Sequence, residues 1–298
     1  MKTIKHLYIL ILFVPVLILA AGCDSTNVSS PEELTEEDLE LAAEIIGESL
    51  SDESDGIMGT IYDAVSDVSR DGIQFQNSQA KSDDENRSGR GSESKYNASY
   101  NPETGEHIIA FRRKIERGTF SKTLAVLMKY IFTSTEGEFL EFPRRQFELV
   151  ESINFTGLRM GTTNTLRRSS SFERVDTLSI TGISASSETL SLRGNHNGSG
   201  EMTVRTERRG SVERSYSLFI ELADVNIDKA LVIENGNLEE GVTGFMRYEL
   251  IKSHTVNGET REKTVSGSIE FEGDGTALLR FDRAGKLFRI ALKNGVAE

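Results

Sequence analysis

The chain has 298 residues, with 34 Lys and Arg against 47 Asp and Glu, so its formal net charge is −13. Phosphate backbones repel a chain of this charge, which argues against nucleic acid as a partner. The chain has a single cysteine, so it cannot form an internal disulfide, and the apolar core has to provide the stability.

The N-terminus has the pattern of a secretory signal. Lys2 and Lys5 form a short positive head, and fifteen residues without charge follow from Leu7 to Ala21. A helix of that length spans about 22 Å, which is short of the roughly 30 Å hydrocarbon core of a bilayer. The pattern therefore predicts a signal peptide over residues 1–22 rather than a transmembrane helix.

The single cysteine follows directly, in the stretch Ala20-Ala21-Gly22-Cys23. This stretch resembles the lipobox of bacterial lipoproteins, although the commonest form has Leu where this chain has Ala20. The resemblance implies cleavage before Cys23, lipid on Cys23 as the membrane attachment, and a place in the cell envelope, at the outer membrane rather than the inner one. An ordinary signal peptide with a free Cys23, or an uncleaved anchor, are the alternatives. Cleavage leaves 276 residues, and the loss of Lys2 and Lys5 takes the formal charge to −15.

A helical segment is expected over residues 35–69, after a short polar tether at 23–34. Ser30 with Pro31 and Glu33, and then Thr35 with Asp38, are typical of helix starts. Apolar residues then recur at helical spacing in two runs, which predict helices near 35–50 and 56–69. The first run is Leu39, Ala42, Ala43, Ile46 and Leu50, and the second is Ile57, Met58, Ile61, Val65 and Val68.

Residues 70–106 are polar, rich in Gly and Ser and almost free of aliphatic side chains. Such a stretch buries too little apolar surface to offset the entropy of ordering it. The composition predicts a flexible linker, with trypsin cleavage at Lys81, Arg87 or Arg90.

From His107 to the end of the chain, the apolar residues alternate with polar ones, and short Gly or Asn turns separate the runs. This pattern predicts an antiparallel domain over 107–298 with roughly ten strands, as a sandwich or a curled half-barrel. The fold class is therefore mainly β with a short N-terminal helical segment. Residues 119–134 fit either a helix or a strand, and the surrounding strands favour a strand. Phe271, Phe281 and Ile290 are expected on one buried face, with Arg280 and Arg289 on the other.

The sequence contains no candidate cluster of catalytic or metal-binding residues. His107 and His254 are expected at exposed strand positions, and His196 in the glycine-rich stretch 194–200 is expected in a hairpin turn. The stretch 224–235 begins like a calcium loop, but Lys229 and Asn235 occupy the positions that need Gly and Glu. The paired arginines, such as Arg112-Arg113, are expected to divide between the two faces of a strand. No cofactor and no metal site are predicted.

The strands and Gly turns of the middle and C-terminal parts resemble uncharacterised lipoproteins of Bacteroidota-like bacteria, a resemblance that implies no known activity. The sequence therefore predicts a lipid-anchored, non-enzymatic binding or structural module. A carrier of an apolar ligand inside a curled sheet is the alternative, and a hydrolase is the third possibility. A protein partner or an apolar ligand would bind the β domain, and the lipid on Cys23 would attach the chain to the membrane.

Overall fold

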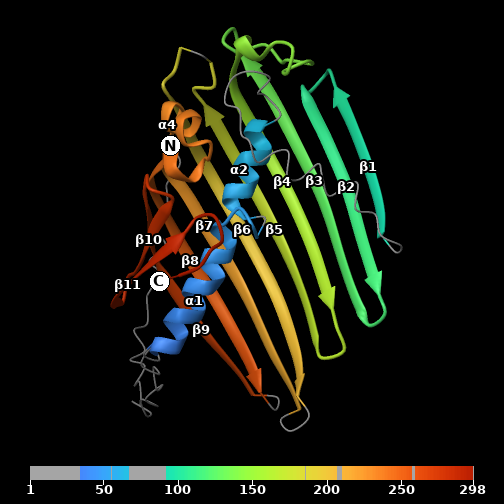
Figure 1. The fold of residues 1–298 in the computed structure, drawn as a ribbon, viewed down its shortest axis with the longest axis vertical. Coiled ribbons are helices and arrows are strands. Elements are labelled where there is room, and N and C mark those ends of the chain that lie inside the picture. Colours follow the sequence, from blue (N-terminus) through green and yellow to red (C-terminus); the bar gives the residue numbers. More distant parts are fainter. Residues whose placement is uncertain are drawn as a thin grey trace, which may run out of the picture. The chain divides into compact units, whose positions relative to one another are not determined.

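The fold was obtained as a computed structural model, which is drawn in Figure 1. The structure describes residues 34–54, 56–66, 92–184, 186–206, 210–256 and 259–297. The predicted signal peptide, Cys23, Ser30 and most of the tether lie outside these residues, as do Val68 and the trypsin sites at Lys81, Arg87 and Arg90. None of the helices in the described ranges has the length and apolar character needed to cross a membrane.

Eleven strands form one antiparallel sheet, in which each strand pairs with its neighbours in the sequence. The order runs from β1 to β11 without a crossover, so the fold is mainly β and antiparallel, as predicted, and it is a single sheet rather than a sandwich. The strands are β1 (Ser92–Asn101), β2 (Glu106–Arg117), β3 (Phe120–Ser134), β4 (Val150–Asn164), β5 (Arg168–Thr181), β6 (Thr189–Thr206), β7 (Gly210–Asp228), β8 (Val242–Val256), β9 (Glu259–Glu272), β10 (Thr276–Phe281) and β11 (Ala284–Ala291).

Two helices, α1 (Glu36–Leu50) and α2 (Ile57–Ser66), lie across one face of the sheet, which we call the inner face (Figure 1). Thr35 is the N-cap of α1 and forms the predicted capping box, in which Thr35 and Asp38 exchange hydrogen bonds. The apolar residues predicted to share one side of each helix are buried together with the inner face of the sheet. Burying each large side chain contributes about 1.5–3 kcal/mol.

The helices and the sheet share one core in the compact unit Leu34–Glu298. Tyr130, Phe155, Leu178 and Met246 project from the strands into this core, and each is almost completely buried. Two short elements, the helix α4 (Lys229–Asn235) and a 3-10 turn at Glu239–Gly241, lie in the connection between β7 and β8.

Two of the sequence predictions are wrong, one about residues 92–101 and one about His196. Strand β1 begins at Ser92 and pairs along its length with β2, so the linker predicted over 70–106 does not extend through Ser92–Asn101. His196 lies in the middle of β6 rather than in a turn. The ambiguous segment 119–134 is the strand β3, as expected.

Candidate functional site

The most unusual chemistry of the described residues is a buried polar cluster between α2 and the inner face of the sheet. Asp176 on β5 and His196 on β6 are direct cross-strand partners, so both side chains project from the same face. Arg159 comes from β4, and Thr60 comes from α2. On the inner face Asp176 lies between Arg174 and Leu178 of β5, whereas glycines flank Arg159 on β4 and His196 on β6 and leave room for the longer polar side chains.

The carboxylate of Asp176 is the centre of this cluster. One oxygen accepts a hydrogen bond from His196 Nδ1 at 2.7 Å, and the other accepts one from the Thr60 hydroxyl at 2.9 Å. Arg159 Nη1 lies 3.4 Å from the second oxygen and also donates to the Thr60 hydroxyl. Asp176 is 1% exposed, Arg159 2% and His196 0%. The charged groups of this cluster are therefore almost completely shielded from solvent.

The protonation of Asp176 follows from these contacts. Burial favours the neutral acid, but the hydrogen bond from His196 and the positive charge of Arg159 outweigh it, so the pKa of Asp176 is lowered from its ordinary value. A carboxylate that accepts from Nδ1 fixes the imidazole orientation. The other ring nitrogen, Nε2, is buried and has no hydrogen-bond partner among the described residues.

A histidine oriented by a carboxylate is also the arrangement of a general base. In this cluster the hydroxyl of Thr60 bonds to Asp176 and Arg159 and not to His196. Among the described residues, no group of three or more His, Cys, Asp and Glu side chains is placed to hold a metal ion. What the geometry shows directly is a polar attachment of α2 to the sheet.

Three further contacts attach the helical part to the sheet and to the connection between β7 and β8. Arg174 on β5 donates to the Ser54 carbonyl at 2.5 Å, in the loop between the helices. Tyr62 on α2 donates to Glu239 at 2.6 Å, and burial raises its pKa well above the ordinary value. Asp38 at the start of α1 accepts from Lys252 at 2.6 Å and from Lys263 at 2.7 Å. Both helices are thus joined to the sheet by polar contacts as well as by apolar packing.

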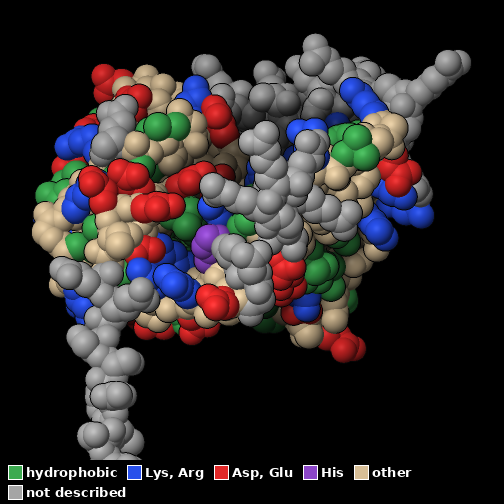
Figure 2. Space-filling model, turned by 90° about the horizontal axis from the view of Figure 1, so that it is seen from below, with side chains coloured by type: hydrophobic (Ala, Val, Ile, Leu, Met, Phe, Trp, Pro, Cys, Tyr) green, Lys and Arg blue, Asp and Glu red, His purple; other side chains and the backbone are tan. Residues whose placement is uncertain are grey.

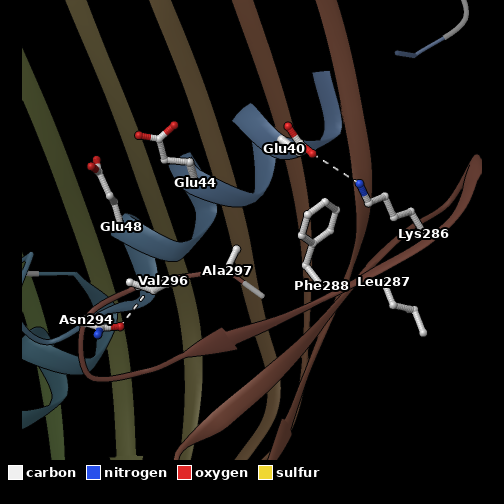
Figure 3. Close-up of a pocket in the computed structure, with 10 residues that line it drawn as sticks. Glu40, Glu44, Glu48, Lys286, Leu287, Phe288, Asn294, Val296 and Ala297 are labelled. Atoms are coloured by element: carbon white, nitrogen blue, oxygen red, sulfur yellow. Dashed lines mark hydrogen bonds and ion pairs between the residues drawn. The ribbon is translucent and has the colours of Figure 1, made fainter. Parts of the chain in front are cut away.

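A groove of about 650 Å³ lies between α1 and β11 (Figure 3). Lys286 reaches across it to Glu36 at 2.6 Å and to Glu40 at 3.6 Å, and its amine lies 4.8 Å from the centre of the Phe288 ring. Glu44 and Glu48 point away from β11 in this view. An amphipathic helix normally exposes such a charged stripe, so this groove by itself identifies no ligand.

The residues singled out from the sequence do not meet at one place. His254 is exposed on β8, as expected. His107 is half-buried on β2, with Nε2 at 2.8 Å from the Leu140 carbonyl oxygen, so the expectation of an exposed position is wrong. In the calcium-like stretch, Asp228 caps α4, and Lys229 Nζ donates to three backbone carbonyls, of Ile183, Ser184 and Ser187.

Sequence reasoning missed Asp176, Arg159 and Thr60 as partners of His196. A signal was present, because Asp176 falls on the same phase of its strand as Leu178 and Ile180, which are buried. A charge on the apolar phase of a strand needs a buried partner. Which partner it has depends on the register between strands, which the alternation does not reveal.

No protein-family model, no curated protein and no solved structure matches the chain.

Proposed function

We propose that the chain is a lipid-anchored, non-enzymatic binding module of the bacterial cell envelope, with the lipid on Cys23. The observation that supports a binding module is the occupation of the inner face by α1 and α2. Leu50, Ile57, Met58 and Ile61 are at most 1% exposed against that face. A carrier would need this apolar surface for its ligand, whereas a binding module can fill it and use its outer surfaces.

The polar contacts strengthen this argument. Asp38, Thr60 and Tyr62 each bond to a side chain of the sheet or of the connection between β7 and β8. A buried polar group that loses its partner costs about 1–3 kcal/mol, so lifting the helices from the sheet would be unfavourable. The helical part is therefore proposed as a permanent part of the domain.

One observation favours the alternative, a carrier of an apolar ligand. The inner face continues past the helices onto β1, β2 and β3, where Ile109, Phe111 and Leu124 are only partly buried among the described residues. Tyr96 on β1 is 67% exposed. An apolar ligand would contact this part of the inner face.

Mass spectrometry of the protein from a membrane fraction tests the anchor and the module together. We expect an N-terminus at Cys23 that carries acyl chains, because stable attachment needs more than one chain. We also expect that no apolar molecule is released on denaturation. A stoichiometric apolar molecule in the denatured sample would favour the carrier instead.

The matched variants are Cys23→Ala and Ser25→Ala. The first should accumulate as an uncleaved precursor, and the second should be processed and acylated like the original chain. If Cys23→Ala is cleaved and released normally, an ordinary signal peptide accounts for the N-terminus and the lipid anchor is wrong.

A further inference from the structure

Positively and negatively charged residues gather at opposite ends of the sheet. Because each strand pairs with the next one in the sequence, alternate connections lie at opposite ends of the sheet. The connections β2–β3, β4–β5, β6–β7 and β8–β9 share one end, at the bottom of Figure 1. We call this the basic end, for the reason that follows.

The hairpins that close at the basic end are rich in Lys and Arg. Residues 112–123 carry five Lys or Arg and one Glu, and residues 160–173, which leave out the buried Arg159 and Arg174, carry two Arg and one Glu. At the opposite end, residues 133–153 carry five Glu and two Arg, and residues 221–247 carry six Asp or Glu and two Lys or Arg. A chain whose net charge is negative thus concentrates its positive charge at one end.

A patch of uncompensated charge lies on the inner face at this end. Arg214 on β7 pairs with His254 on β8, and His254 pairs with Arg261 on β9. All three side chains are exposed, and none makes an ion pair within the described residues. The two arginines therefore flank His254 on the same face of the sheet. Figure 2, seen from this end, shows a His side chain with Lys and Arg side chains beside it, and Asp and Glu side chains exposed on the same side.

The start of α1 lies near the same end. Asp38 bonds to Lys252 and Lys263, which are one inner-face position away from His254 and Arg261. Lys252 is paired with Tyr216, which is six residues from the first residue of β7 and twelve from the last. At about 3.3 Å per residue, the start of α1 is roughly 20 Å from the basic end of β7 and roughly 40 Å from its other end.

The chain between Cys23 and α1 limits which end can meet a membrane. Glu36 is thirteen residues after Cys23, and thirteen residues reach at most about 45 Å when fully extended. A lipid on Cys23 therefore allows the basic end to touch the membrane easily. The acidic end could do so only with this stretch almost straight.

We propose that the basic end docks on an anionic lipid surface, with the strands standing away from the membrane and the acidic end outermost. The orientation rests on the proposed lipid anchor, but the affinity for anionic lipid does not. Each Lys or Arg near such a surface strengthens binding about fivefold and its effect falls off within a Debye length. Phosphate groups of the lipid would supply the counter-charges that Arg214 and Arg261 lack.

The test uses the chain from Asp24 on, without lipid, which keeps the whole compact unit Leu34–Glu298. Its binding is measured by co-sedimentation with vesicles of phosphatidylcholine alone and of phosphatidylcholine mixed equally with phosphatidylglycerol. We expect binding to the mixed vesicles only, weakening as salt is added. The variant Arg214→Glu/Arg261→Glu should bind at least about 25-fold more weakly.

The control variant is Arg145→Glu/Lys293→Glu, which changes the net charge by the same amount away from the basic end. Both of its residues are exposed, and it should bind like the original chain. Equal losses in the two variants would mean that only net charge matters, and the proposal would fall. Binding to a DNA duplex but not to the mixed vesicles would also overturn it.

Amide exchange on the vesicles then reports the orientation. The turn between β2 and β3, at Arg117–Phe120, should become protected, and the turn between β3 and β4, at residues 135–138, should not. Protection at the second turn alone would contradict the proposal. If Cys23 proves to carry no lipid, vesicle binding by the unlipidated chain still decides the affinity, so the two proposals can fail separately.

Discussion

Asp176 is a charged residue in the apolar core, and its contacts decide what its removal does. Replacing it with Ala leaves His196 and Arg159 buried without their shared partner. We expect a loss of about 3–5 kcal/mol in the free energy of unfolding. Thr60→Val, which removes one hydroxyl from the cluster, should cost about 1 kcal/mol. Urea denaturation of the chain from Asp24 on measures both losses.

The same residue predicts a pH dependence. Because the pKa of Asp176 is lower in the folded chain than its ordinary value, its contribution is present above about pH 4 and is lost as the pH falls through the folded pKa. Asp176→Ala should therefore lose part of the acid sensitivity. Glu173→Ala, on the same strand but exposed on the opposite face, is the control and should change stability by less than about 0.5 kcal/mol. Equal effects at the two positions would mean that the cluster adds nothing to stability.

At the scale of the element, the alternation of apolar residues predicted the register of the last strands correctly. Phe271, Phe281 and Ile290 are buried on the inner face, while Arg280 and Arg289 are not buried. Phe281→Ala should cost about 3–5 kcal/mol of unfolding free energy, because a cavity replaces a ring that packs against Tyr248 and Phe288.

The neighbouring position on the same strand is the control for this prediction. Arg280→Ala removes one ion pair, with Glu270 at 3.3 Å, in which both side chains are about half exposed. It should cost less than about 1 kcal/mol. A large loss at Arg280 in chemical denaturation, or a small one at Phe281, would contradict the assignment of the buried and exposed faces of β10.

The strand segments that the sequence did not predict were missed for one physical reason, because residues from a neighbouring strand stabilise them. The stretch 194–200 was predicted as a turn from its glycines, but β6 runs through it, and at Gly200 the ring of Tyr216 fills the space that a side chain would need. Phe172 does the same at Gly161 on β4. Aromatic rings from a neighbouring strand cover these glycines. Local composition cannot show this, because the ring comes from another part of the chain.

Strand β1 was also not predicted, because local composition does not show its pairing with another strand. Its composition is that of a linker, and it becomes a strand because β2 offers ten paired positions beside it. The period of the helices was easier to predict, since each apolar run of α1 and α2 carries its own pattern. Their position on the sheet was not predicted, because nothing in the runs says which surface they cover.

At the scale of the molecule, the simple order of the strands turns local sequence into a long-range property. Arg112 and Arg113 on β2 divide between the two faces as predicted, whereas Arg144 and Arg145 lie in the connection between β3 and β4, and Arg167 lies in the turn before β5. The pair Arg208-Arg209 lies outside the described residues. The division of the arginines between the two faces of each strand suggested that no basic patch would form. The order β1 to β11 adds that hairpins two apart in the sequence close at the same end. Their charges then accumulate there, which is the basis of the proposed contact with lipid.

The shared core also predicts how the molecule responds to proteolysis. The composition of 70–106 still predicts trypsin cleavage at Lys81, Arg87 or Arg90. Such a cut would separate α1 and α2 covalently from the sheet. Because both helices are buried against its inner face, we expect the two fragments to elute together in gel filtration and to separate only in denaturant. Their association should withstand high salt, since apolar burial rather than exposed ion pairs dominates it.

A variant of the helical part makes this prediction decisive. Ile46→Asp places a charge at a position that is 0% exposed, so the nicked fragments should dissociate without denaturant. Glu44→Gln, at an exposed position two residues before Ile46, should leave the two fragments associated. Dissociation of the unaltered nicked chain would mean that the helices pack only loosely, and the inner face would then be open to an apolar ligand. Resistance of the whole stretch to trypsin would instead show that its polar composition does not make it a linker, and that it packs on the domain.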